Sequence, residues 1–111
     1  MKNLPAREKL DLAEKVAQYL VVAGSLDKSS VQEDYDRANE LSLELAMLLP
    51  TAIYRSMVEA VTHPNAKVNP ASVAIMMRHE LIFPDQGTLE PDHVGFHVPG
   101  VPAERPRGKA H

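Results

Sequence analysis

Two histidines four residues apart, His93 and His97, could bind a metal ion, with Glu90 and Asp92 as possible oxygen ligands. On a helix, side chains four residues apart share one face. Here apolar residues alternate with others from His93 to Val98, which predicts an extended backbone and places the two histidines roughly 13 Å apart. One zinc ion needs each nitrogen within about 2.1 Å. The spacing therefore favours two surface or interface imidazoles, and we expect no cofactor.

A third histidine, His79, has an arginine before it and a glutamate after it near the end of the last expected helix. Consecutive side chains on a helix point in different directions, so these three do not converge on one substrate atom. A general acid–base role for His79 would need a carboxylate from elsewhere, such as Asp85 or Asp92. A solvated polar face is the favoured interpretation. The rival hypothesis is a metal-binding protein or small enzyme that uses His79, His93 and His97.

Composition excludes several kinds of chemistry. The 111 residues contain no cysteine, which rules out disulfides, thiolate metal sites and thiol nucleophiles. No phosphate-binding loop, dinucleotide fingerprint or nucleophile elbow is present. Residues 1–98 hold nine Lys and Arg against fourteen Asp and Glu, whereas residues 99–111 hold three basic side chains against one acidic. An acidic body disfavours nucleic acid as a partner, because Lys and Arg must neutralise phosphates.

The apolar runs of the chain are short. None approaches the roughly 20 residues of a membrane-spanning helix, and the N-terminus leads directly into a charged amphipathic segment. We therefore expect a soluble, cytoplasmic protein.

Four amphipathic stretches predict an all-α fold, a small four-helix bundle-like body over residues 1–83. The first helix is expected over residues 5–23, with Gly24 as a left-handed C-terminal cap. The second has a capping-box sequence, Ser-Val-Gln-Glu, at residues 30–33. Because Pro50 removes a backbone donor and disfavours helical geometry at Leu49, this helix should end or kink there.

The third helix is expected from about Thr51 to Thr62, and the fourth begins with Asn69 as its cap and Pro70 as its first residue. Each of the first three helices should bury one apolar stripe. The stripes expected in the first three helices are Leu10, Ala13, Val16, Ala17 and Leu20; Val31, Tyr35, Ala38, Leu41, Leu45, Leu48 and Leu49; and Ile53, Met57, Ala60 and Val61.

The fourth helix has apolar residues on more than one face, which indicates a central helix or an oligomer contact. Residues 84–98 are expected to form a turn and a short extended segment that packs on the body or a partner. Residues 99–111 are expected to be a flexible, Pro-rich basic tail.

A homodimer would cover the apolar surfaces of the fourth helix and of the extended segment. Alternatively, the extended segment folds back over the fourth helix of its own chain. The predicted contact residues are Ile75, Met76, Met77, Leu81, Ile82, Val94, Phe96 and Val98.

An acidic stripe, Glu33, Asp36, Glu40 and Glu44, follows the second helix and could face a basic partner or simply be solvated. By elimination, the sequence favours a non-enzymatic protein-interaction module. It would act as a regulator, an assembly component or an inhibitor by occupying a partner protein's surface. Besides the histidine-based rival, a small-ligand binder with its pocket between helices is a further alternative.

Overall fold

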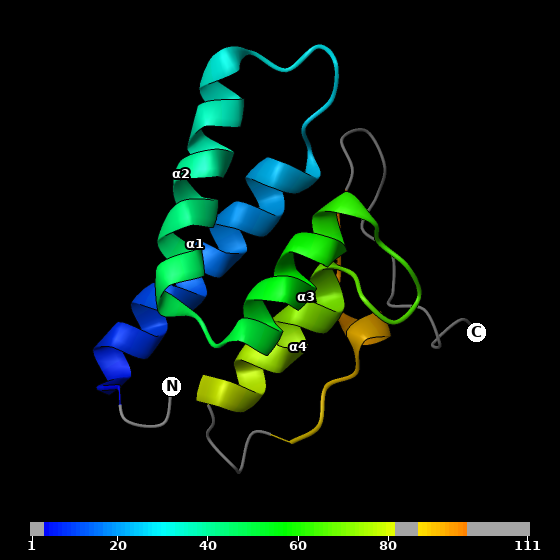
Figure 1. Cartoon of the computed structure of the whole chain (residues 1–111). Helices are drawn as coiled ribbons and strands as arrows, with labels where there is room; N and C mark the ends of the chain where they lie inside the picture. Colours follow the sequence, from blue (N-terminus) through cyan, green and yellow to red (C-terminus); the bar gives the residue numbers. More distant parts are fainter. Residues whose placement is uncertain (1–3, 82–86, 98–111) are drawn as a thin grey trace, which may run out of the picture.

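The protein is an all-helical domain in a computed structural model that describes residues 4–81 and 87–97 (Figure 1). Its elements are α1 (Ala6–Gly24), α2 (Gln32–Leu48), α3 (Thr51–Thr62), α4 (Pro70–Leu81) and a single-turn 3₁₀ helix, η2 (Pro91–His93). The described residues contain no β-strand. The predicted all-α domain with four helices is therefore confirmed.

Helices α1 and α2 form an antiparallel pair (Figure 1). The Lys15 ammonium lies 3.1 Å from the Glu44 carboxylate, and the Arg37 guanidinium donates to the Gln18 side-chain oxygen over 3.0 Å. As the residue number rises along α1 it falls along α2, which fixes the opposite directions of the two helices. Helix α3 packs against α4 and α1, and η2 contacts α4.

The core lies where all four α-helices meet. It is centred on side chains with no exposed surface: Leu41 and Leu45 of α2, Met57 of α3 and Val73 of α4. Val16 contributes from α1. With few aromatic residues available, unbranched and branched aliphatic side chains supply the apolar area whose removal from water drives folding.

The predicted stripes of α1 and α2 are wrong in part. In α1, Leu10 and Ala17 are exposed, whereas Leu12 and Tyr19 are buried. Helix α1 carries enough apolar residues for two adjacent stripes, and packing against α2, α3 and α4 selects the one that contains Leu12. Three members of the stripe predicted for α2 are exposed: Val31 at the N-cap, and Tyr35 and Leu48 within the helix.

Two predicted caps are also wrong. Gly24 is the last residue of α1 and is not left-handed; Gly87, with φ of 78°, has the one positive φ angle among the described residues. Val31 takes the N-cap position of α2 without a side-chain hydrogen bond. The Ser30 hydroxyl instead accepts the Asp27 N–H over 2.9 Å. Ser30 therefore stabilises the loop before α2 instead of capping the helix.

The starts of α3 and α4 are confirmed. Helix α2 ends at Leu48, Pro50 precedes α3, and α3 spans the predicted residues. Pro70 is the first residue of α4. The Asn69 side-chain oxygen accepts the Ser72 N–H over 3.0 Å, as expected of a helix cap.

The predicted extended segment begins differently. His93 belongs to the 3₁₀ turn η2, and the backbone becomes extended only at Val94, with φ −78° and ψ 124°. The turn begins at Pro91, whose fixed φ angle suits a first helical position, and His93 Nδ1 accepts the Glu90 N–H over 3.3 Å. The alternation of apolar residues from His93 to Val98 could not predict this 3₁₀ turn, because the turn depends on Pro91 and on the hydrogen bond between Glu90 and His93.

Candidate functional site

The three histidines of the rival hypothesis occupy separate positions. His79 is exposed on α4, and His97 is exposed beyond η2. His93 is partly buried and uses Nδ1 to close its own turn. Within residues 4–81 and 87–97, no group of three or more metal-ligating side chains is placed to hold an ion. Asp85, one suggested partner of His79, lies outside the described residues.

The predicted homodimer contact residues have different environments. Met77 is buried in the core, and Ile75, Met76 and Val94 are partly buried. Leu81 ends α4, whereas Ile82 and Val98 lie outside the described residues. Phe96 is 64% exposed. Among the predicted members whose side chains are described, Phe96 therefore presents the most exposed apolar surface.

The acidic stripe divides into two groups. Glu44 turns toward α1, where its carboxylate pairs with Lys15 and both side chains are partly buried. On the outer face of α2, Glu40 pairs with Arg37 over 2.9 Å, and Asp36 accepts a hydrogen bond from Gln32. Glu33 is exposed in the first turn of the helix. Glu44 thus joins two helices, whereas the other three carboxylates face solvent.

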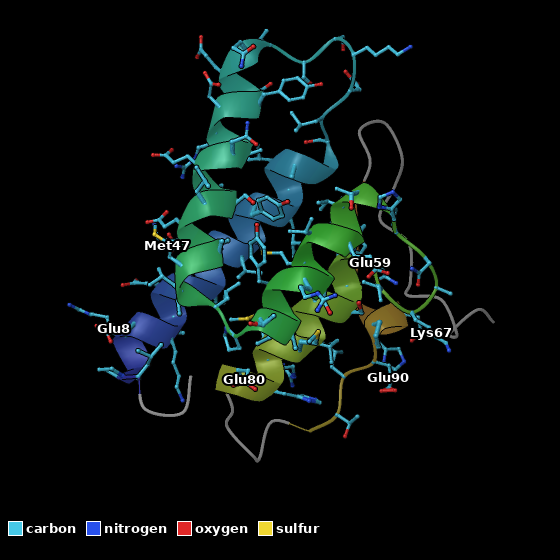
Figure 2. The ribbon with its side chains drawn as sticks, viewed as in Figure 1. Glu8, Met47, Glu59, Lys67, Glu80 and Glu90 are labelled. Carbon is cyan, nitrogen blue, oxygen red and sulfur yellow. The ribbon has the colours of Figure 1, made fainter. Side chains whose placement is uncertain are left out.

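The sequence prediction missed an apolar surface on the outside of α2. Leu43 is 69% exposed and Met47 is 78% exposed, one helical turn apart. Figure 2 shows Met47 pointing away from the helical body. The signal was present, because Leu41 and Leu45 already fill the buried face at a spacing of four. Leu43 and Met47 repeat that spacing on the opposite face.

A part-open cavity of about 440 Å³ lies between α1, α4 and the segment that contains η2. Its lining is apolar except for one arginine. The lining residues are Ala13, Val16, Ala17, Leu20, Ala74, Ile75, Met77, Arg78, Leu89 and Val94. The lining therefore combines residues that are distant in sequence.

A small polar cluster lies beside the core, where the hydroxyls of Ser42 and Tyr54 are 2.9 Å apart. Burial raises the pKa of the neighbouring Tyr19 hydroxyl, and the proximity of Tyr54 adds to this shift, whereas a hydrogen bond with Ser42 opposes it. The folded state therefore holds the Tyr19 proton more tightly than the unfolded chain does.

Alkaline pH should consequently destabilise the fold through Tyr19. Above pH 10.0, the ordinary tyrosine pKa, the unfolded chain releases this proton first and binds fewer protons than the native state. The free energy of unfolding then falls as pH rises through the folded pKa. Urea unfolding at about pH 8 and about pH 11 should show a smaller alkaline loss for Tyr19→Phe than for the wild type. Equal losses would contradict this assignment.

Comparison with known proteins gives no family, since the chain matches no family model, no curated protein and no solved structure. None of the helices in the described part of the chain is long and apolar enough to cross a membrane.

Proposed function

We propose that this protein is a cytoplasmic, non-enzymatic interaction module that binds a partner protein through the outer face of α2. The observation that carries the proposal is the exposure of two large apolar side chains, Leu43 and Met47, one turn apart. Exposed apolar surface on a small domain is costly in water, and its burial stabilises a complex. Occupying the partner's surface in this way suits a regulator, an assembly component or an inhibitor.

The residues beside this apolar pair specify the chemistry of the partner. Asp36, Glu40, Leu43 and Met47 recur at spacings of four, three and four, so they form one row along α2, here called the outward row. All four are exposed. Its first half is acidic and its second half is apolar. The outward row would be complemented by a partner segment that carries an apolar side chain and, one or two helical turns away, a basic side chain. The same acidity disfavours nucleic acid.

Affinity capture tests whether the outward row binds a partner. The wild-type full chain and its variants are each used to capture proteins from an extract of the cells that produce this protein. Leu43→Ser with Met47→Ser should weaken the affinity for a captured protein by about tenfold or more. Val21→Ser, at a 71% exposed position on α1, is the matched control and should retain the protein. Asp36→Lys with Glu40→Lys should slow association, because charges at an interface steer encounter.

Capture that is identical for the wild type and the Leu43–Met47 double variant would reject the outward row as the binding surface. Circular dichroism should first show that both serine variants keep the wild-type helical signal. Because the replaced side chains are exposed, the free energy of unfolding of these variants should change by at most about 0.5 kcal/mol per substitution.

Self-association remains a separate proposal, a homodimer with Phe96 at the contact. Its support is the 64% exposed phenylalanine beside the partly buried Val94. The competing explanation is that this segment folds back over α4 of its own chain. The contact of η2 with α4 within one chain favours that explanation for the residues that precede Phe96. Light scattering at micromolar concentration separates the two. A dimer mass that falls to the monomer mass on Phe96→Ala would support the homodimer, and a monomer mass for the wild type would reject it.

A further inference from the structure

We propose that the cavity between α1, α4 and residues 89–94 binds a small amphipathic carboxylate, for which a medium-chain aliphatic acid is the simplest representative. Its volume of about 440 Å³ lies within the roughly 300–1,000 Å³ of small-molecule sites. Such sites combine predominantly apolar walls with a few polar groups that fix the orientation of the ligand. This cavity has that composition.

The apolar part of the ligand is specified by small side chains on two helices. Ala13 and Ala17 line the cavity from α1, and Ala74 lines it from α4. A leucine at any of these positions would fill space that alanine leaves open. An aliphatic chain in that space would gain dispersion contacts with the cavity walls and remove apolar area from water.

The carboxylate end is specified by Arg78, the charged residue of the cavity lining. Its side chain is partly buried, so its charge is screened less than that of a surface arginine. Arg78 already has an interaction within the chain. A guanidinium has five N–H donors in a planar fork, however, and can serve a second partner. Carboxylate geometry matches that fork.

The remaining wall is formed by Leu89 and Val94, on either side of η2. This segment runs beside α4 (Figure 1). A ligand beneath it would contact three segments of the chain at once, so its apolar part would be enclosed more fully than on one helix surface. The cavity shares no residue with the outward row of α2, and the two proposals can therefore fail independently.

Titration calorimetry on the full chain tests the site, with decanoate as the probe and decanol as its uncharged counterpart. We expect saturable one-to-one binding of decanoate. Ala17→Leu should weaken it by about tenfold or more, because the new side chain occupies the cavity. Ala46→Leu, at an exposed alanine of α2, is the matched control and should leave the affinity unchanged. Arg78→Gln should weaken decanoate by about tenfold and leave decanol unchanged.

Three results would overturn the proposal, provided that circular dichroism shows each variant folded. The first is the absence of saturable decanoate binding. The second is binding that Ala17→Leu does not weaken, which would indicate adsorption elsewhere on the surface. The third is decanol binding as tightly as decanoate with no effect of Arg78→Gln, which would assign a neutral apolar ligand to the cavity instead.

Discussion

Replacing Leu45 by alanine should lower the free energy of unfolding by about 2–5 kcal/mol. Leu45 has no exposed surface, and it packs in the cluster that joins all four α-helices. The substitution removes apolar contacts and leaves a cavity that the surrounding helices can close only in part. For a domain of this size such a loss is a large share of the total stability.

The matched control lies two residues earlier in the same helix. Leu43→Ala removes the same atoms from a side chain that is 69% exposed, so we expect a change within about 0.5 kcal/mol. Urea unfolding followed by circular dichroism measures both variants, with the slope compared to check that each unfolds in two states. Equal destabilisation by the two substitutions would mean that α2 buries a different face.

The starts of α3 and α4 could be predicted from the sequence, because each depends on residues next to the helix. Pro50 and Pro70 restrict their own backbones and lack a donor, and Asn69 can satisfy a backbone amide three residues away. These effects act within a few residues, so they can be read without knowledge of the tertiary structure.

The capping box at residues 30–33 failed for a related reason, because a serine has several local partners to choose from. Ser30 accepts the Asp27 N–H, and the Asp27 carboxylate accepts hydrogen bonds from Ser29. The hydrogen bonds from the Ser29 hydroxyl and the Ser29 backbone N–H to this carboxylate lower the pKa of Asp27. The sequence indicated a polar loop here but could not indicate which of its pairings forms.

The buried faces of α1 and α2 could not be predicted fully, because each helix has more apolar residues than one face requires. Whether Leu10 or Leu12 enters the core depends on the angle at which α1 meets α2, α3 and α4. The candidate surfaces follow from that choice. Leu43 is exposed only because Leu41 and Leu45 face inward, and the cavity exists only where residues 89–94 return to α1 and α4.

Replacing Asn69 by alanine should lower the free energy of unfolding by about 1–2 kcal/mol. Its side-chain oxygen accepts the Ser72 N–H at the start of α4, over 3.0 Å. Its side-chain nitrogen donates to the backbone oxygens of Asn65 and Ala66. One side chain thus satisfies a helix amide and also closes the loop between α3 and α4. Alanine can do neither.

Two further variants separate these contributions. Asn39→Ala, at an exposed position within α2, should leave stability unchanged or raise it by a few tenths of a kcal/mol, because alanine favours the helix interior. Asn69→Asp keeps the oxygen that caps α4 and loses the donor to Asn65 and Ala66, so its stability should lie between the wild type and Asn69→Ala. Thermal or urea unfolding at neutral pH orders the variants. If Asn69→Ala were as stable as Asn39→Ala, the α4 cap would contribute nothing, and the packing of Val73 and Met77 into the core would alone determine where the helix begins.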